Sequence, residues 1–509
     1  MPRGKAIMVQ GTGSHVGKSV LAAALCRILR QDGYRVAPFK AQNMSNNAAV
    51  CIGGGEIGRA QAEQAAACGI EPTTAMNPIL LKPCTDVGSQ VVVMGHATGT
   101  MTAKQYQSHK MSLLPQVRQA LESLLAQYDV VVIEGAGSPA EINLKQYDLV
   151  NMRTAALADA QVVLVGDIDK GGVFAQLVGT WELLEEDERR RVCGLVINKF
   201  RGDLDILAPG LDYLQQRLKR PVLGVVPYLR GLRIAEEDTI PADRVDRQAT
   251  KSGLRIDIIR HPRIANFTDF DALGDAASYV SQPPADLPDA IILPGTKSTI
   301  ADLHQLRSAG FEPWLRRARQ AGVEIVGICG GFQMLGRTIL DPDCVESPQE
   351  LTEGLGFLDC STVFQAVKET ARVTGIHVES GATVEGYEIH MGCTQGNPGP
   401  QPLFRIRQRH GIAAEGYDGA ASPDGLVWGT YLHGLFDNDL FRRWWLKRLS
   451  GRSKKEVRSE PSSDRLEAQG EREAPVPVLQ QDREDRFDAL AAAVRKAIDV
   501  EHLYRILWN

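Results

Sequence analysis

The chain lacks several features that would place it in a special class of protein. Its 509 residues contain nine cysteines, and no two of them stand in a Cys-x-x-Cys pair. That spacing is typical of structural zinc sites, whereas dense cysteine pairs are typical of disulfide-linked secreted domains. The sequence therefore argues against a zinc site and against a disulfide framework, and it fits a protein of the reducing cytoplasm.

Long hydrophobic runs and an excess of positive charge are also absent. No apolar stretch approaches the roughly 20 residues of a membrane-spanning helix, and the apolar segment at residues 6–9 is too short for a secretory signal. The formal net charge of −5 gives no sign of a surface for nucleic acid or membranes. With 43% hydrophobic residues the chain can bury large cores. We expect a globular enzyme with small-molecule substrates; the sequence indicates no oligomeric state.

Short apolar runs that alternate with longer helical patterns predict an α/β fold. This alternation implies parallel sheets covered by helices on both faces, whose ligands bind beyond the carboxyl ends of the strands. Buried strands are expected at residues 6–10, 35–39, 91–94, 130–133, 162–165 and 195–197, and in the second half at 256–259 and 290–293.

Changes in composition divide the chain into two domains. A polar, irregular stretch at residues 236–253 is the expected linker between a first domain at 1–235 and a second domain at 254–450. Residues 451–484 are charged and contain prolines, which predicts a solvated linker. Apolar residues at helical spacing then predict a C-terminal helix at 485–509 that packs back on a domain.

A phosphate-binding loop follows the first predicted strand. Glycines let backbone N–H groups approach phosphate oxygens, a lysine supplies charge, and a serine hydroxyl suits Mg²⁺. Thr12 stands where the strict pattern has glycine, so the loop is a variant form, and an ordinary glycine-rich turn is the alternative reading. The residues expected to bind ATP in this loop are Gly11, Thr12, Gly13, Gly17, Lys18 and Ser19.

Polar residues after other predicted strands extend this site. Lys40, Glu134 and Asp167 each follow a buried strand, and each taken alone could be an ordinary turn residue. Beside a phosphate loop they predict a site in which Ser19, Glu134 and Asp167 hold Mg²⁺ while Lys40 contacts ATP. Asn198 is a weaker candidate for contacting the purine of ATP.

A cysteine framed by glycines ends a predicted strand in the second half of the chain. Residues 324–336 read as an apolar strand, then Cys329, then a helix. A sharp strand-to-helix turn exposes a side chain and aims the following N–H groups at the reacting oxygen. Cys329 is therefore predicted to be a nucleophile, with a buried structural cysteine as the alternative. The backbone at Gly330 and Gly295 is expected to form an oxyanion hole.

A thiol nucleophile needs a base, and two histidines are candidates. His433 follows an apolar strand near the end of the second domain and is the expected base. His390 is a rival for the same role. A lone histidine is more often structural than catalytic, so the pattern by itself leaves the choice open.

Together these segments resemble the cobyric acid synthase family, the glutamine-dependent amidotransferases of cobalamin biosynthesis. The resemblance extends from the N-terminus to about residue 450 and implies an N-terminal domain similar to dethiobiotin synthetase and a C-terminal domain similar to class I glutamine amidotransferases. It rests on residues 9–19, 38–47, 141–144, 167–175, 263–270 and 294–299 and on the segments around Cys329 and His433.

The resemblance also implies a mechanism. Cys329 attacks the glutamine amide, His433 transfers protons, and the released ammonia reaches the ATP-binding half without meeting bulk water. ATP and Mg²⁺ convert a carboxylate, which is a poor electrophile, into an acyl phosphate that ammonia displaces. The implied substrates are glutamine, ATP and adenosylcobyrinic acid a,c-diamide, a corrinoid that is amidated at four peripheral carboxylates to adenosylcobyric acid.

One position departs from the wider class I pattern. Leu435 stands where most class I members have a glutamate that orients the catalytic histidine. The resemblance implies that this family shares His-Gly-x-Phe here, so the loss does not imply inactivity. The sequence leaves the group that orients His433 open, with Glu388 as one candidate.

Two other readings stand beside this one. Cobyrinic acid a,c-diamide synthase has the same two halves but acts on the a and c carboxylates, and residues 43–47 argue against it. A nucleotide switch related to partition ATPases would carry an inactive amidotransferase half, which the presence of Cys329 and His433 disfavours.

The loops at 53–56 and 136–151 are the expected corrin contacts.

Overall fold

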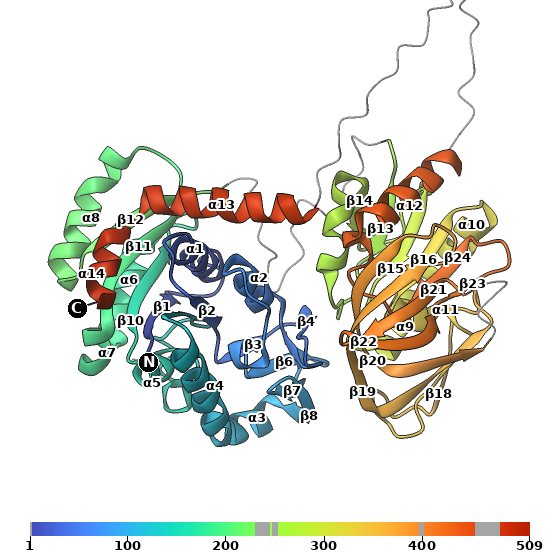
Figure 1. The fold of residues 1–509 in the computed structure, drawn as a ribbon, viewed down its shortest axis with the longest axis horizontal. Coiled ribbons are helices and arrows are strands. Elements are labelled where there is room, and N and C mark those ends of the chain that lie inside the picture. The colour runs from blue at the N-terminus through green and yellow to red at the C-terminus, as the bar shows by residue number, and fades with distance from the viewer. Residues whose placement is uncertain (1–2, 230–244, 247–252, 397–401, 453–478, 509) are drawn as a thin grey trace, which may run out of the picture. The chain divides into compact units, whose positions relative to one another are not determined.

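The computed structural model describes residues 3–229, 245–246, 253–396, 402–452 and 479–508. The chain divides into two compact units, of which the first is Met1–Thr239 with Glu484–Asn509 and the second is Ile240–Arg483 (Figure 1). The linkers expected at 236–253 and 451–484 lie mostly outside the described residues, and the last part of the second one, residues 479–484, is helical rather than a linker. None of the described helices has both the length and the apolar character that crossing a membrane requires.

A six-stranded parallel sheet of order β12-β11-β10-β1-β9-β2 forms the centre of the first unit. Valine and isoleucine fill its strands because both faces are covered. The strands are β1 (Lys5–Gly11), β2 (Val36–Phe39), β9 (Val130–Glu134), β10 (Gln161–Asp167), β11 (Val192–Phe200) and β12 (Val222–Pro227). The expected α/β class is thus confirmed for this unit.

Helices pack on both faces of this sheet. Successive side chains of a strand point to opposite faces, so Met8 of β1 joins one core and Ile7 joins the other. Before the C-terminal segment, the described helices of the unit are α1 (Lys18–Gln31), α2 (Arg59–Ala67), α3 (Ala103–His109), α4 (Leu114–Gln127), α5 (Met152–Ala158), α6 (Val173–Leu183), α7 (Glu186–Arg191) and α8 (Leu204–Leu218), with short 3-10 turns at Thr74–Met76, Lys110–Leu113 and Lys145–Tyr147.

The expectation that residues 91–94 belong to the parallel sheet is wrong. Residues 91–93 lie in β7 (Gly88–Val93), within a separate sheet of order β3-β6-β7-β8 in which β7 runs antiparallel to both neighbours, and Met94 lies in the turn that follows. Short turns at 84–87 and 94–95 join these strands, whereas parallel neighbours need a long crossover. The other strands here are β3 (Gln42–Met44), β6 (Ile79–Pro83) and β8 (His96–Thr102), with a small hairpin of β4 (Ala48–Val50) and β5 (Glu56–Gly58).

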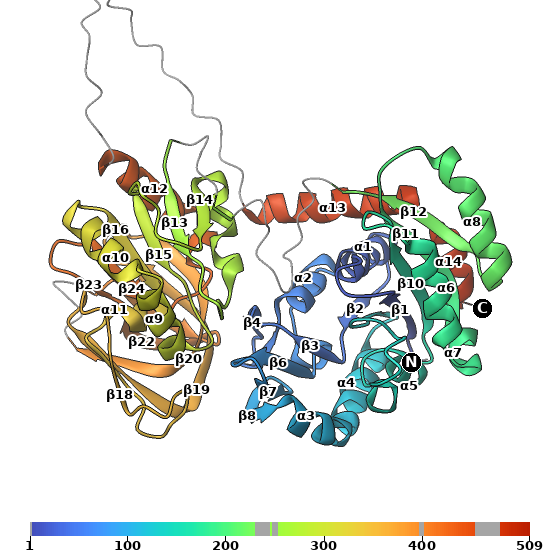
Figure 2. The same ribbon diagram turned by 180° about the vertical axis from the view of Figure 1, so that it is seen from behind.

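The C-terminal segment forms two helices where the sequence pattern predicts one. α13 (Leu479–Ala497) lies along α1, and α14 (Val500–Trp508) follows it (Figures 1 and 2). The break arises because Ile498 pairs with Gly224 of β12 and the Asp499 N–H donates to the Leu223 carbonyl at 2.7 Å. Apolar residues of both helices join the core that contains β1 and α1: Phe487, Leu490, Ala491, Val494, Leu503 and Leu507.

Gly224 leaves no room for a side chain beneath these helices. A Cβ at this position would lie 2.0 Å from the Ala497 carbonyl oxygen and 2.7 Å from the Ile498 Cα. We expect Gly224→Ala to displace the C-terminal helices and lower the free energy of unfolding by about 1–3 kcal/mol, measured by urea denaturation. Gly179→Ala is the matched control, since a Cβ there has no atom of the described residues within 4 Å. Equal stability of the two variants would contradict this packing argument.

The second unit contains a sheet of order β14-β13-β15-β16-β24-β23, parallel except for β23. Its strands are β13 (Ile256–Ile259), β14 (Ala277–Val280), β15 (Ala290–Leu293), β16 (Glu324–Ile328), β23 (Ala420–Ala421) and β24 (Val427–Thr430). Its helices are α9 (Thr299–Ser308), α10 (Phe311–Gln320), α11 (Gly330–Leu335) and α12 (Asp439–Arg452), with 3-10 segments η5 (Phe267–Ala276) and η6 (Leu435–Asp437).

A second, mainly antiparallel sheet completes this unit and was not anticipated from the sequence. Two long strands, β19 (Cys360–His377) and β20 (Thr383–Gly396), form its hairpin. The isolated bridge between Tyr387 of β20 and His433 joins this sheet to the end of β24. The remaining strands are β17 (Thr338–Leu340), β18 (Leu351–Glu353), β21 (Phe404–Arg409) and β22 (Ile412–Asp418).

Candidate active sites

Cys329 lies at the sharp turn between β16 and α11. Its backbone has φ 50° and ψ −107°, a strained conformation for a residue with a side chain. Gly331 lets the helix approach the neighbouring strand closely, because a Cβ there would lie 1.9 Å from the Leu293 carbonyl oxygen. The glycines after the cysteine thus hold the thiol at the carboxyl end of the sheet.

His433 lies beside Cys329 and is 1% exposed. A Cβ on Gly295 would be 3.0 Å from His433 Cε1 and 3.8 Å from Cys329 Cβ. Both side chains therefore lie next to Gly295. Burial lowers the pKa of His433, but the Asp269 carboxylate and the hydrogen bond with Cys329 outweigh it and raise the pKa to about 10. The imidazole is therefore protonated at neutral pH, and it holds this proton next to the Cys329 side chain.

Asp269 is the carboxylate that orients His433. Since a carboxylate only accepts hydrogen bonds, His433 Nδ1 is the donor to Asp269 Oδ2, at 2.6 Å. The other oxygen, Oδ1, accepts from the Tyr387 hydroxyl at 3.2 Å and from the Gly434 N–H at 3.1 Å. Three donors thus hold the carboxylate, and the Tyr387 ring stacks on the His433 ring with centroids 5.1 Å apart.

The two rival residues from the sequence have other partners. The Glu388 carboxylate forms an ion pair with Arg409, and its Oε2 lies 4.0 Å from His390 Nε2. His390 Nδ1 bonds the Gly392 carbonyl at 2.8 Å, and its ring stacks on Tyr431 with centroids 3.9 Å apart. The geometry therefore favours His433 as the base and Asp269 as its partner.

The backbone at Gly295–Thr296 approaches the residue that follows the cysteine. A Cβ on Gly330 would lie 2.7 Å from Thr296 Cγ2 and 3.1 Å from the Thr296 nitrogen. The turn is held in place because the Thr296 hydroxyl donates to Asp302 and the Ala265 N–H donates to the Gly295 carbonyl at 2.8 Å. The two segments expected to form an oxyanion hole thus lie side by side.

The phosphate loop of the first unit has the backbone that its glycines predict. Gly17 has φ 99°, and a Cβ there would lie 2.1 Å from Asn198 Nδ2. Asn198 donates to the Val16 carbonyl at 2.8 Å, so its amide N–H supports the loop. Lys18 reaches across the loop and donates to the Gly13 carbonyl at 2.7 Å.

Glu134 is the centre of the polar contacts next to the loop. Its Oε1 accepts from Ser19 Oγ at 2.8 Å and from Lys40 Nζ at 3.0 Å, and its Oε2 accepts from Gln64 Nε2 at 2.5 Å. Burial raises the pKa of Glu134, but the Lys40 charge and these donors lower it below its ordinary value overall. The carboxylate is therefore ionised. Sequence reasoning missed Gln64, which lies in an Ala-rich helix with no motif of its own.

Asp167 has different partners. Its carboxylate accepts from Lys199 Nζ at 2.9 Å and from the Asp169 N–H at 2.9 Å, while Lys199 also donates to the His15 carbonyl at 2.6 Å. The structure therefore joins Ser19 to Glu134 directly and ties Asp167 to the loop through Lys199. Within the described ranges, no group of three or more His, Cys, Asp or Glu side chains could hold a metal ion.

Two residues at the start of the loop connect it to the neighbouring strand and helix. The Thr12 N–H donates to the Val165 carbonyl at 2.9 Å, and its hydroxyl donates to Gln176 Oε1 at 3.1 Å. A Cβ on Gly11 would lie 2.4 Å from Val16 Cγ2, so the loop folds tightly over this residue. Thr12 in place of glycine is thus accommodated through hydrogen bonds of its own.

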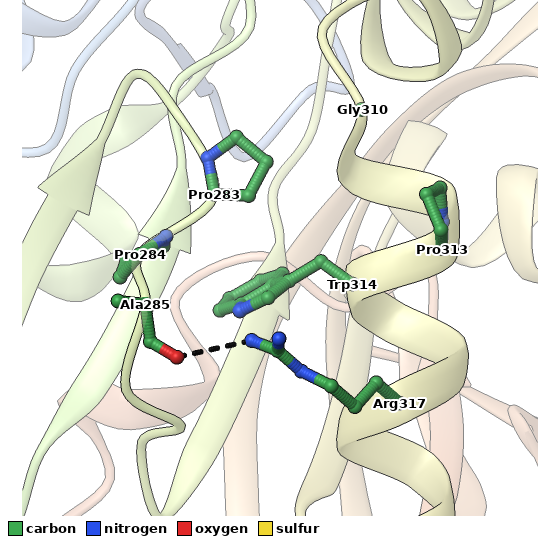
Figure 3. Close-up of a pocket in the computed structure, with 7 residues that line it drawn as sticks. All are labelled: Pro283, Pro284, Ala285, Gly310, Pro313, Trp314 and Arg317. Atoms are coloured by element: carbon green, nitrogen blue, oxygen red, sulfur yellow. Dashed lines mark hydrogen bonds between the residues drawn. The ribbon is translucent and has the colours of Figure 1, made fainter.

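A hollow of about 430 Å³ lies on the surface of the second unit, between the segment before β15 and α10 (Figure 3). Arg317 crosses it and donates to the Ala285 carbonyl at 3.1 Å. Its lining residues are Pro283, Pro284, Ala285, Gly310, Pro313, Trp314 and Arg317. The hollow thus includes none of the residues around Cys329.

Comparison with known proteins assigns each half. The family model of the CobQ/CobB/MinD/ParA nucleotide binding domain matches residues 7–242, and that of the CobB/CobQ-like glutamine amidotransferase domain matches 255–441. A cobyric acid synthase of Pelotomaculum thermopropionicum is 47% identical over 99% of this chain and 96% of its own length. Those of Desulforamulus reducens and Dehalococcoides mccartyi are 45% and 47% identical, over 100% and 99% of this chain and 99% of their own lengths.

These matches confirm the expected α/β fold of both halves and the expected reaction type. A nucleotide-binding domain and a glutamine amidotransferase domain in one chain form an enzyme that hydrolyses glutamine and uses ATP to make an amide. Because the relatives match over nearly their whole length, the resemblance extends beyond the two domains. The chain belongs to the cobyric acid synthase family, the glutamine-hydrolysing amidotransferases of cobalamin biosynthesis.

Proposed function

We propose that this enzyme converts adenosylcobyrinic acid a,c-diamide into adenosylcobyric acid by amidating four peripheral carboxylates. The observation that carries the proposal is the pairing of two reactive sites in one chain. One is the triad of Cys329, His433 and Asp269, and the other is the phosphate loop with its Glu134 cluster. The first suits ammonia release from glutamine, and the second suits activation of a carboxylate by ATP. Since Cys329 must remain a thiol, a cytoplasmic location fits.

The glutamine reaction follows from the first site. The Cys329 thiolate attacks the side-chain amide carbon of glutamine, and N–H groups at Gly330 and the Gly295–Thr296 turn stabilise the oxyanion. Protonated His433 gives its proton to the leaving nitrogen, so ammonia departs and a thioester forms. Asp269 keeps the imidazole in the required tautomer throughout. Water then hydrolyses the thioester and glutamate is released.

Amide formation follows from the second site. Backbone N–H groups of residues 11–17 bind the phosphates of ATP, while Lys18 and Lys40 neutralise their charge. A corrin carboxylate attacks the γ-phosphorus and becomes an acyl phosphate, which ammonia converts into the amide. Asn198 contributes to ATP binding by holding the phosphate loop through its hydrogen bond to the Val16 carbonyl.

The residues present fit Mg²⁺, because Ser19 and Glu134 offer hard oxygen ligands that already lie 2.8 Å apart. When bound, the ion would neutralise charge on the β- and γ-phosphates. Lys40 and Gln64 hold the Glu134 carboxylate in place for that role. Asp167, which lies on the Lys199 side of the loop, is the further ligand that we propose.

The test is a count of amidations. Purified enzyme is incubated with glutamine, Mg·ATP and adenosylcobyrinic acid a,c-diamide, and carboxylate-to-amide conversions are counted by mass spectrometry. We expect four conversions and none when ATP is omitted. No conversion with either glutamine or ammonia would overturn the proposed substrate, and the corrin without the a and c amides would then be tested.

A further inference from the structure

Asp302 is a buried carboxylate that anchors the Gly295–Thr296 turn beside Cys329. It lies in the first turn of α9, where the helix dipole stabilises negative charge, and it is 0% exposed. Burial raises the pKa of Asp302 to about 6, although the Thr296 hydroxyl and Arg263 oppose this change. At mildly alkaline pH the carboxylate is therefore ionised and only accepts hydrogen bonds. A buried charge is unfavourable unless it is paired and hydrogen-bonded, so its partners indicate its role.

Two hydrogen bonds meet at one oxygen of Asp302. Its Oδ2 accepts from the Thr296 hydroxyl and from the Arg263 N–H, the latter at 3.3 Å. The Arg263 carbonyl lies 3.1 Å from the Thr296 hydroxyl, but a hydroxyl has one hydrogen and the charged carboxylate is the stronger acceptor. The same hydroxyl oxygen accepts from the Ser298 N–H at 3.1 Å. The Thr296 side chain is thus held by both a donor and an acceptor.

The backbone of the turn pairs with a neighbouring segment. Residues 263–265 and 295–297 form a short antiparallel bridge in which Ile264 lies opposite Thr296, and the hydrogen bonds on either side of this pair measure 2.8 and 2.9 Å. Because a pair flanked in this way makes no hydrogen bond of its own, the Thr296 N–H points away from the bridge. Gly330 approaches this nitrogen, since a Cβ there would lie 3.1 Å from it. The Thr296 N–H is therefore not used in the bridge and lies beside the turn of the nucleophile.

We propose that Asp302 is a positioning residue of the glutamine site, which fixes the direction of the Thr296 N–H as an oxyanion donor. It acts through the Thr296 hydroxyl rather than through contact with glutamine. When the Cys329 thiolate attacks, negative charge develops on the amide oxygen, and an N–H that already points at this oxygen stabilises it best. Asp302 adds a charged anchor from α9 to the backbone bridge, so the turn is held from two sides. The inference rests on the proposed function, because it concerns the donors of the proposed glutamine reaction.

The other groups of the site have anchors of their own. Asp269 accepts from His433, from the Tyr387 hydroxyl and from the Gly434 N–H, and none of these bonds involves Asp302. Loss of Asp302 should therefore weaken oxyanion stabilisation and leave the thiol unchanged. Iodoacetamide separates the two effects, because alkylation of a thiolate displaces iodide and forms no oxyanion, whereas glutamine hydrolysis forms one.

The test compares Asp302→Ala with Asp257→Ala. The second variant is the matched control, since Asp257 is another buried carboxylate of the same unit and pairs with Arg255. Glutamate release is measured with Mg·ATP and the corrin present, and alkylation of Cys329 is followed by mass spectrometry. For each Cys329 that can be alkylated, we expect kcat to fall about 100-fold in Asp302→Ala, the loss that a misplacement of about 1 Å can cause. KM for glutamine and the alkylation rate stay unchanged, and Asp257→Ala retains the wild-type kcat.

Two further variants keep the test decisive even where Asp302→Ala does not fold. Thr296→Val removes the hydroxyl but keeps the backbone N–H, and it should lose as much kcat as Asp302→Ala. Asp302→Asn keeps an acceptor for the hydroxyl, so its kcat should lie between those of the wild type and Thr296→Val. A wild-type kcat in folded Asp302→Ala or Thr296→Val, or an alkylation rate that falls as far as kcat, would overturn the inference. Glutamate release without amide in the wild type would instead contradict the proposed function and leave the comparison of kcat values valid.

Discussion

Replacing Cys329 by alanine is expected to abolish amidation with glutamine and to preserve amidation with ammonia. The thiolate at the turn between β16 and α11 is the nucleophile of the proposed glutamine reaction, and alanine offers no atom that could form the thioester. We expect the glutamine-dependent rate to fall at least about 10⁴-fold. The phosphate site, with Lys18 and Glu134, is unchanged by this substitution, so ammonia supplied as an ammonium salt restores amide formation. Mass spectrometry of the corrin measures both rates.

Cys360→Ala is the matched control for this experiment. Cys360 is another buried cysteine of the same unit, and burial raises the pKa of its thiol to about 11, so it stays protonated. We expect this variant to use glutamine as the wild type does. Glutamine-dependent amidation by Cys329→Ala would contradict the assignment of the nucleophile, because glutamine would then be hydrolysed elsewhere.

The parts of the fold that the sequence predicts are those that depend on local pattern. The strands at 130–133 and 162–165 read as buried because both faces of β9 and β10 are covered, and the phosphate loop follows from glycines next to a strand. Residues 91–93 are valines as well but pair antiparallel in another sheet. A short apolar run predicts a strand, whereas its partner depends on the length of the connection that follows.

In the candidate sites too, local sequence predicts some residues, whereas others depend on contacts between distant segments. Cys329 and Lys18 lie in glycine-rich turns that local sequence reveals. Asp269 is 164 positions from His433 and meets it only because η5 and the end of β24 pack together. The position that carries a glutamate in class I relatives holds Leu435, which is buried at 2% exposure. Asp269 lies in the segment 263–270, which is one of those that carry the family resemblance, and this is the signal by which it could have been found. Spacing along the sequence does not reveal that its partner is His433.

Replacing Asp269 by asparagine is expected to lower glutaminase activity and to move its pH dependence. The asparagine can still occupy the site, but it no longer fixes the tautomer of His433, and the comparable loss in a serine protease triad is about 10⁴-fold. The substitution also removes the charge that raises the pKa of His433 to about 10, while the burial that lowers this pKa remains. The imidazolium then persists only at lower pH, so the alkaline limb of kcat/KM shifts towards neutral pH.

Asp257→Asn is the control, because Asp257 is a buried carboxylate of the same unit that pairs with Arg255 rather than with His433. We expect this variant to retain both the kcat/KM and the alkaline limb of the wild type. If the role of Asp269 were purely structural, activity would fall in proportion to the folded fraction of the protein, and the alkaline limb of kcat/KM would not shift. If the alkaline limb of kcat/KM does not shift in folded Asp269→Asn, another group orients His433. If the limb shifts and ammonia-dependent amidation is intact, the substitution acts through His433 alone.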